Sequence, residues 1–406
     1  MPFLALLAVI GPGVIAASAG NDAGGISTYS VAGARYGYTM LWMMLAITPS
    51  FIIVQEMAGR MGAATGKGFA ALIRERFGLR PTFYAMLMLF ASTAATTVAE
   101  FAGIAAAMEL FGVSRFVSVP IAAIVVWLLV VRGSYRSIEK VLLGLSSVFI
   151  AYVIAAFLAR PDWGEVGRSF ITPHVIPDRA FIALSIGIAG TTIAPWMQFL
   201  LQSNIVDKGT TMKEWALARW DVMVGAAAAN VIACFIIITT AAVLHPAGIS
   251  VESASDAAQA LAPLAGPYAE MLFAIGLLSA SVLAAAVLPL TASYAVCEAF
   301  GWESGLDRSW SEAPLFNGLY TFVILASAAV ILLPGLNLIA IMLVSQVING
   351  VLLPFLLIFM MIIINDHRIM GRHVNNRVNN VLSWSTIAVV IALTAALTGM
   401  TVLGIG

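Results

Sequence analysis

Long apolar segments recur along this chain and restrict what it can fold into. Eleven such segments follow one another through the 406 residues, separated by short polar connections. A helix that crosses a bilayer needs about 20 apolar residues, and inside the bilayer only helices and closed barrels satisfy their own backbone hydrogen bonds. Only 10% of the residues are charged, whereas soluble domains carry about 25%. We therefore expect an all-α polytopic membrane protein with about 11 transmembrane helices.

The apolar segments locate these helices and the connections between them. We place the helices near residues 2–19 continuing at 26–35, 40–62, 82–112, 117–132, 139–159, 181–206, 215–244, 268–300, 315–334, 336–364 and 379–403. Residues 253–264 are too polar to span and predict an external interfacial helix or loop, and residues 162–179 predict an external loop. No basic residue precedes the first apolar segment, so we interpret it as a span and not as a cleavable signal peptide.

The basic residues indicate the orientation. If the N-terminus is cytoplasmic, fifteen Lys and Arg residues fall on the cytoplasmic side and five outside, which is a strong positive-inside bias. We expect an integral protein of a prokaryotic cytoplasmic membrane, with its C-terminus outside. The lipid bilayer is its expected surrounding, and we expect a monomer with no nucleic-acid partner and no obligate protein partner. The two cysteines lack metal-ligand spacing and lie in different spans.

A carboxylate interrupts the first predicted span. Asp22 stands at membrane depth, where a charge costs several kcal/mol unless it is offset. Three glycines, at positions 20, 24 and 25, weaken the helix around it. Unwound backbone at this depth has to line a cavity or pack against protein. We favour Asp22 as a cation ligand in a broken helix; the alternative is a neutral Asp that caps a kink.

The sixth predicted span is interrupted as well. Pro195 removes a backbone donor and clashes with the preceding turn, and Gly187 and Gly190 loosen the same region. Thr191 and Thr192 can bond the backbone groups that this interruption frees. Ordinary kinks are the simple alternative, because Gly and Pro are common in membrane helices.

The positions of the two interruptions predict an inverted repeat. The sixth span stands five spans after the first, and an odd shift reverses the orientation of the second copy. We expect a single transmembrane domain over residues 1–406, with repeats at about 1–160 and 180–365 and an additional helix at about 379–403. In such five-plus-five transporters, substrate and ions bind where the two broken helices meet.

Several short motifs resemble those of the Nramp family of divalent metal transporters. They lie at residues 11–13, 22–25, 32–38, 60–68, 74–77, 190–195, 345–347 and 353–355. The resemblance covers most of the chain. It implies a LeuT-like fold with broken helices 1 and 6, alternating access, and uptake of manganese or iron together with protons.

The sequence departs from the family pattern at the ion site. The first-helix motif Asp-Pro-Gly-Asn reads Asp-Ala-Gly-Gly at residues 22–25, so Gly25 replaces a ligating Asn. Ala194 stands in place of the metal-binding Met, and Trp196 in place of the His. The third-helix pattern Asp-x-x-Glu has lost its Asp and keeps Glu100. This set resembles the Nramp-related magnesium transporters, a branch that keeps the fold and changes the ion.

These departures favour a hard, hydrated ion. Manganese, iron and cadmium gain from a thioether ligand, whereas magnesium does not. Magnesium typically keeps several waters and is held by one or two carboxylates. The expected site has Asp22 as its one carboxylate and is widened by the small residues Gly25 and Ala194. Such a roomy site suits a largely hydrated Mg²⁺, and we include Mn²⁺ as a second possible substrate.

The expected ion site combines residues from both breaks. Asp22 supplies the charge, and the resemblance implies that the carbonyls of Ala19 and Thr191 take part and that Gln346 lies near the ion. Asn349 is interpreted as a polar contact between helices. The expected metal site comprises Asp22, Ala19, Gly25, Thr191, Ala194 and Gln346, with Asn21, Thr192, Gln198, Trp196 and Glu100 as further candidates.

The function expected from these residues is electrogenic uptake of a divalent cation without proton coupling. Trp196 replaces the family's His, and all four histidines lie in loops, so no proton relay is evident. The membrane potential alone is sufficient to drive uptake of a divalent cation, because two charges that cross 100 mV gain roughly 4.6 kcal/mol. The alternatives are a proton-coupled Mn²⁺/Fe²⁺ symporter and an organic solute transporter of the same fold. No enzyme motif and no cofactor is expected.

Two features near the cytoplasmic ends of the spans have simple interpretations. Glu56 and Arg60 are spaced i, i+4 and predict a helix ion pair, with an inner gate contact as the alternative. Residues 365–380 carry histidines and asparagines without the spacing of a metal site, and predict a solvated cytoplasmic loop.

Overall fold

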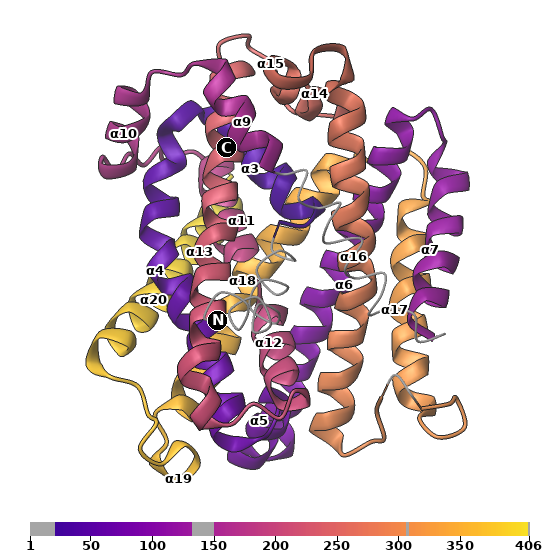
Figure 1. The fold of residues 1–406 in the computed structure, drawn as a ribbon, viewed down its shortest axis with the longest axis vertical. Coiled ribbons are helices and arrows are strands. Elements are labelled where there is room, and N and C mark those ends of the chain that lie inside the picture. Colours follow the sequence, from indigo (N-terminus) through magenta and orange to yellow (C-terminus); the bar gives the residue numbers. More distant parts are fainter. Residues whose placement is uncertain (1–20, 132–149, 306–307, 405–406) are drawn as a thin grey trace, which may run out of the picture.

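The protein is a bundle of long helices joined by short connections (Figure 1). The computed structural model describes residues 21–131, 150–305 and 308–404. The main helices are α3 (Ala23–Tyr36), α4 (Leu41–Thr65), α6 (Leu79–Leu110), α7 (Arg115–Val131), α9 (Ile150–Ala159), α11 (Arg179–Thr192), α12 (Pro195–Asp207), α13 (Met212–Val243), α16 (Ala269–Phe300), α17 (Pro314–Ile331), α18 (Leu338–Ile364) and α20 (Arg377–Leu403). The shorter ones are η1 (Gly37–Met40), α5 (Phe69–Phe77), α10 (Trp163–Ile171), α14 (Ala254–Ala258), η3 (Gln259–Leu261), α15 (Ala262–Ala265), η4 (Gly266–Tyr268) and α19 (His367–Met370).

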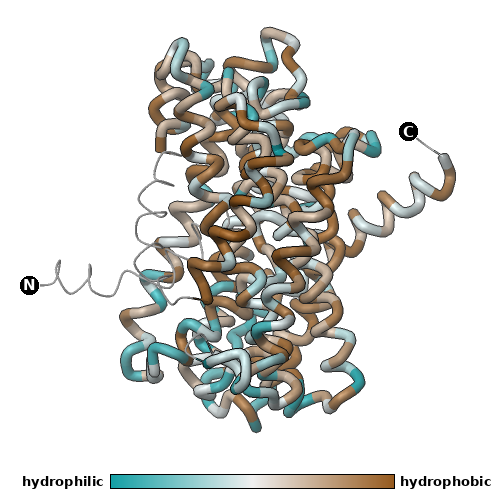
Figure 2. The backbone as a smooth tube through the Cα atoms, turned by 90° about the vertical axis from the view of Figure 1, so that its right-hand side faces the viewer, coloured by the Kyte–Doolittle hydropathy of each residue, from teal (hydrophilic) through white to brown (hydrophobic). Residues whose placement is uncertain are grey.

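The helices agree with the predicted spans. Within the described residues, eight helical segments are long and apolar enough to cross a membrane, and α7 and α9 are shorter apolar helices. A helix lies at each predicted span from residue 26 onward, although residues 2–19 and 139–149 lie outside the described part of the chain. Apolar residues dominate the middle of the bundle and hydrophilic residues gather toward its two ends (Figure 2). This is the pattern expected for a protein with lipid around its middle.

The two interrupted segments lie inside the bundle. Helix α6 packs along α16 and α18, α3 packs against α13, α11 and α6, and α12 packs against α4. In the segment formed by α11 and α12, 89% of the most apolar window is buried, whereas only 11% is buried in α20. The broken sixth span is therefore surrounded by protein, as unwound backbone requires.

A polar layer separates two apolar cores. One core contains Phe101 of α6 and Met342 of α18, and the other contains Leu89 of α6 and Leu353 of α18. Between these positions both helices carry buried polar side chains: Ser92, Thr93, Thr96 and Thr97 on α6, and Ser345, Gln346 and Asn349 on α18. The bundle thus buries its hydrogen-bonding side chains at one level, between two layers of apolar packing.

Two connections differ from what the sequence predicts. Residues 162–179 contain helix α10, whose N-cap Asp162 accepts the backbone N–H groups of Gly164 and Glu165, so this segment is not simply a loop. The expected interfacial segment at 253–264 forms the short helices α14, η3 and α15. Both lie at the end of the bundle opposite α5 and α19 (Figure 1).

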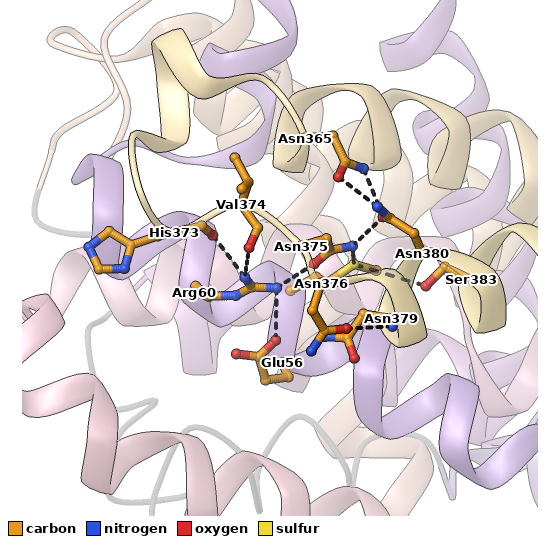
Figure 3. Close-up of polar contacts among 11 residues, drawn as sticks. Glu56, Arg60, Asn365, His373, Val374, Asn375, Asn376, Asn379, Asn380 and Ser383 are labelled. Atoms are coloured by element: carbon orange, nitrogen blue, oxygen red, sulfur yellow. Dashed lines mark hydrogen bonds and ion pairs between the residues drawn. The ribbon is translucent and has the colours of Figure 1, made fainter.

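The connection before α20 is held by Arg60 of α4 (Figure 3). The guanidinium of Arg60 pairs with Glu56 at 3.1 Å, which confirms the predicted ion pair. It also donates to the carbonyls of His373 and Val374 at 2.8 and 3.0 Å, and to Asn375 Oδ1 at 2.5 Å.

The same connection is tied to the ends of its own flanking helices. Asn375 donates to Asn380 Oδ1 at 3.0 Å, and Asn380 and Asn365 exchange two hydrogen bonds of 2.9 Å. Residues 371, 372 and 376 are exposed, as expected for a solvated loop, and residues 373–375 are half-buried. These three residues contact a largely buried cation and link the segment before α20 to α4.

Candidate functional site

Asp22 begins helix α3. Its backbone is extended (φ −72°, ψ 179°), and its Oδ1 accepts the backbone N–H of Gly25 at 2.6 Å. The side chain is buried, with 3% exposure of the residue. The hydrogen bond is the capping contact of the simpler interpretation, and it uses only part of the acceptor capacity of a carboxylate. Asp22 can therefore cap α3 and still face a cation.

Glu100 of α6 brings a second carboxyl group to the same helix start. Its Oε2 accepts the backbone N–H of Ala23 at 3.3 Å, and Glu100 is completely buried. The carboxyl groups of Glu100 and Asp22 are neighbours. We expected Asp22 as the only carboxylate, with Glu100 as a further candidate; the structure places both acids together. The N-terminus of α3 favours negative charge there.

The second break separates α11 from α12. Ile193 (φ −121°, ψ 60°) and Ala194 (φ −63°, ψ 136°) leave the helical conformation, and Pro195 is the first residue of α12. No side chain caps α12. Proline suits this position because its missing N–H would have no partner in the first turn. The sixth span is thus broken where the sequence predicts, and at the break Ala194 contributes only a methyl group.

Side chains from both breaks meet around a small cavity. The hydroxyl groups of Tyr29 in α3 and Thr192 in α11 lie 3.0 Å apart. The cavity offers about 10 Å³ to the centre of a water molecule, room for about one water. It is lined by Asn21, Tyr29, Phe51, Thr191, Thr192, Ala229 and Asn230. Neither Asp22 nor Gln346 is among the residues that line this cavity.

Gln346 of α18 lies against the first turn of α3. A Cβ atom at Gly24 would overlap the Gln346 amide group, so the close approach of the two helices requires glycine there. A second close approach joins α11 to α18, where a Cβ at Gly190 would collide with the backbone of Gly350. These contacts place Gln346 beside the residues of both breaks.

Three polar residues that we did not assign to the site hold Gln346 in place. Asn349 donates to Gln346 Oε1 at 3.1 Å and to Thr96 Oγ1 at 2.9 Å, and its Oδ1 accepts from Ser92 at 2.6 Å. Asn349 thus forms the predicted contact between helices, and it also orients Gln346. The available signal was the spacing of four between Ser92, Thr96 and Glu100, which puts all three on one helix face.

The remaining candidates are placed as follows. Asn21 donates to the carbonyl of Ala229 at 3.5 Å and lines the cavity. Trp196 packs within the apolar core that includes Leu89 and Leu353. Gln198 is buried in the first turn of α12, and its Nε2 has no hydrogen-bond partner among the described residues. Ala19 lies outside the described residues.

The far ends of α3 and α11 are joined by one side-chain contact. Tyr36 donates its hydroxyl to Asp178 Oδ2 at 2.7 Å, and Asp178 also caps α11 by accepting the N–H of Phe181 at 3.3 Å. The Tyr36 hydrogen bond holds the pKa of Asp178 below its ordinary value. Tyr36 and Phe181 add an edge-to-face ring contact at 5.2 Å. The helices that lead to the two breaks are thus tied together at one end.

The polar side chains at the two breaks carry carboxyl, hydroxyl and amide groups. Over residues 21–131, 150–305 and 308–404, no three His, Cys, Asp or Glu side chains form a group that could hold a metal ion. What the structure does bring together is one acidic pair with hydroxyl and amide groups around it. Oxygen ligands of this kind suit hard divalent cations.

The sequence and the fold both resemble known transporters. The family model described as natural resistance-associated macrophage protein-like (Nramp) matches residues 13–399. The divalent metal cation transporter MntH of Deinococcus radiodurans is 30% identical over 401 residues, which cover 96% of this chain and 88% of that protein.

Solved structures support the fold. The Eremococcus coleocola manganese transporter in complex with an aromatic bis-isothiourea substituted compound has a TM-score of 0.78 at 23% identity, covering 96% of this chain and 86% of that one. MhsT in complex with L-phenylalanine has a TM-score of 0.62 at 16% identity, covering 95% and 98%. The expected LeuT-like membrane transporter fold is confirmed.

Proposed function

Since this chain belongs to the Nramp family, we propose that it transports divalent metal cations through the site at its two helix breaks. The family consists of transporters and not enzymes, and the metal is substrate, not a cofactor. The observation that carries the proposal is the buried carboxyl pair of Asp22 and Glu100 at the start of α3. Two buried acids are costly without a cation, and a dication offsets them.

The proposed ligand set follows from the placement of the side chains. Asp22 is the charged ligand, and Gln346 and the hydroxyl groups of Thr191 and Thr192 supply neutral oxygen atoms directly or through water. Asn21, Thr191 and Thr192 line the small cavity between the two breaks. Because this cavity has room for only about one water, a hydrated ion needs the helices around the breaks to separate. Alternating access supplies that separation.

We propose that the preferred ion is largely hydrated Mg²⁺, with Mn²⁺ also accepted. No Met or Cys is among the residues that line the cavity, and Ala194 puts a methyl group at the second break. Without a sulfur ligand, softer ions lose their advantage over Mg²⁺. The small Gly25 and Ala194 leave space for retained water once the site opens.

We propose further that uptake is driven by voltage and moves no protons. Trp196 stands where a titratable imidazole is expected in ordinary members of the family, and it packs in an apolar core. The two charges of the ion alone allow accumulation of about three decades per 100 mV.

A proton-coupled Mn²⁺/Fe²⁺ symporter is the second candidate, and one contact favours it. Glu100 lies beside Asp22, so the site contains a second acid that is able to carry a proton. The two candidates differ in one observable, which is the movement of protons during metal uptake.

The arrangement in the membrane completes the proposal. We propose repeats at about residues 1–160 and 180–365, with α20 outside them, and an orientation that puts α5 and α19 in the cytoplasm and the C-terminus outside. The low burial of α20 and the basic residues of the α4–α5–α6 region support this arrangement.

Ion competition in proteoliposomes tests the proposed function. Purified protein is reconstituted with a metal-sensitive dye and a pH-sensitive dye inside, and Mg²⁺, Ca²⁺, Mn²⁺ and Cd²⁺ are compared under an imposed potential. We expect voltage-dependent Mg²⁺ uptake with no pH change. Acidification that scales with metal uptake selects the symporter instead, and absence of any divalent uptake contradicts both candidates.

A further inference from the structure

An apolar groove runs along the outside of the bundle where the start of α6 meets the end of α18. Its volume is about 370 Å³. Its walls are Pro81, Tyr84 and Met88 of α6 and Phe355, Ile358 and Phe359 of α18, with Arg80 at one end. Tyr84 and Phe355 are 60% and 47% exposed. The groove therefore opens toward the surroundings of the bundle, which for these two spanning helices is lipid.

Arg80 is the charged residue at the end of this groove. It is exposed, and it forms no ion pair within the described residues. Two other cations of this region have carboxylate partners: Arg76 pairs with Asp366 at 2.7 Å, and Lys67 pairs with Glu75 at 2.5 Å. Arg80 is thus a cation without a protein partner, next to an almost wholly apolar groove.

We propose that this groove binds an anionic phospholipid, with one acyl chain along α6 and the phosphate on Arg80. The groove extends from Arg80 to Met88, eight residues or about 12 Å of helix, so it runs from the end of the bundle toward its middle as an acyl chain does. An arginine at a helix start with an aromatic ring one turn further is also the arrangement found where membrane helices meet the headgroup layer.

The preference for negative charge arises from Arg80. An acyl chain in the groove leaves a bilayer that is equally apolar, so the groove retains either lipid through its shape and does not discriminate between headgroups. A basic residue near the membrane surface favours an anionic lipid by about five-fold, which corresponds to ~1 kcal/mol. We therefore expect selectivity for headgroup charge and not for chain length.

The position of the groove connects it to the transport site. Met88 lies one turn before Ser92, and Phe355 follows Asn349 by six residues on α18. Ser92 and Asn349 are hydrogen-bonded at 2.6 Å within the network that orients Gln346. A lipid in the groove therefore packs against the two helices that hold this network. The proposal does not depend on which ion is carried.

Lipid binding is measured on the full-length chain. Purified protein is titrated with phosphatidylglycerol or phosphatidylcholine, and bound lipid is counted by native mass spectrometry. We expect about five-fold more retained phosphatidylglycerol than phosphatidylcholine. Arg80→Gln should abolish this preference. Arg372→Gln removes an exposed arginine at the same end of the molecule and should leave the preference unchanged.

A second variant tests the groove itself. Met88→Trp narrows the groove without changing the charge, and it should lower the retention of both lipids several-fold. Unchanged retention in Met88→Trp would place the lipid elsewhere. An undiminished preference in Arg80→Gln, or an equal loss in Arg372→Gln, would overturn the role of Arg80. Because Arg80 is exposed, its variant should unfold at the same temperature as the wild type, and this is checked in parallel.

Discussion

The starts of α3 and α12, the two positions where the sequence predicts a break, differ in the side chains around them. At the first, the start of α3 is surrounded by carboxylates: Asp22 accepts the N–H of Gly25, and Glu100 accepts the N–H of Ala23. At the second, the start of α12 has no side-chain cap, and Pro195 removes one N–H group by its own chemistry. The start of α3 therefore has acidic side chains beside it, whereas the start of α12 has only neutral groups.

Because of this difference, we expect the two breaks to contribute differently to ion binding. A carboxylate that accepts a single N–H keeps further lone pairs for a cation, so the first break supplies the attraction for a dication. The second break offers hydroxyl groups, backbone and a methyl group, which add little attraction and decide which ion fits. We infer that charge at α3 sets affinity, whereas size and softness at Ala194 set selectivity.

Removing the charge of Asp22 should have the largest effect. Asp22→Asn keeps an acceptor for the Gly25 N–H but loses the negative charge. We expect divalent uptake to fall about a hundredfold, since losing a charged ligand costs about 3 kcal/mol. The measurement is initial uptake rate in proteoliposomes at several metal concentrations.

A variant without the cap separates binding from folding. Asp22→Ala should lose uptake to the same extent and also about 1 kcal/mol of stability, seen as a lower unfolding temperature. Near-normal uptake in either variant would mean that the first break is structural only.

Glu100→Gln should have the next largest effect. The glutamine still accepts the N–H of Ala23, so the fold is retained, but the second charge is gone. We expect about a tenfold loss of uptake, because a carboxylate beside Asp22 contributes roughly 1.4 kcal/mol to binding a dication. If uptake instead stays normal while a proton signal seen in the wild type disappears, Glu100 is a proton carrier and the symporter candidate is favoured.

The double substitution Ala194→Met with Gly25→Asn should change selectivity more than rate. A thioether at the second break adds a soft ligand, so the ratio of Cd²⁺ and Mn²⁺ uptake to Mg²⁺ uptake should rise about tenfold. Ion competition measures this ratio directly. Ala194→Leu is the matched control, since it adds bulk without sulfur and should lower all uptake without reordering the ions. An unchanged order in the double variant would separate the second break from selectivity.

The smallest effect is expected for the hydrogen bond between Tyr36 and Asp178, which joins the far ends of α3 and α11. Asp178 has a lowered pKa because Tyr36 donates to it. A lowered pKa in the folded protein stabilises it above the ordinary pKa of aspartate, near 4, and this contribution is lost as the pH falls through the lowered value.

Tyr36→Phe should therefore cost less than about 1 kcal/mol at pH 7, since the pair is partly exposed. The difference from wild type should shrink below about pH 4. Unfolding temperatures of both proteins across pH 3 to 7 provide the check. A difference that persists unchanged at low pH would indicate packing with Phe181 and not the hydrogen bond.

The sequence predicted the breaks more completely than it predicted the residues around them. Pro195 interrupts the helix by a local backbone effect, so its consequence is visible from neighbours in the chain, whereas Gly24 and Gly25 lie inside the first turn of α3. The partners of Asp22 are not local, because Glu100 stands 77 residues from Ala23 in sequence. Its place beside Asp22 depends on how α6 packs.

The contacts of Arg60 also divide into a local one that the sequence predicts and distant ones that it does not. Its pairing with Glu56 is a contact within one helix and follows from the spacing. Its bonds to residues 373–375 join positions more than 300 residues apart, and no pattern along the chain indicates them. The loop keeps exposed residues, as its composition predicts, and residues 373–375 also contact the Arg60 guanidinium.

The amino-acid sequence by itself determined that this protein lives in a bilayer, where its helices lie and where two of them fail, because hydrophobicity and backbone propensity act between near neighbours. Only the tertiary structure decided that two acids share one helix start, that α6 and α18 meet in a polar layer, and that α4 holds α20. Those outcomes depend on contacts between distant segments, whose geometry is set by packing and not by the order of residues.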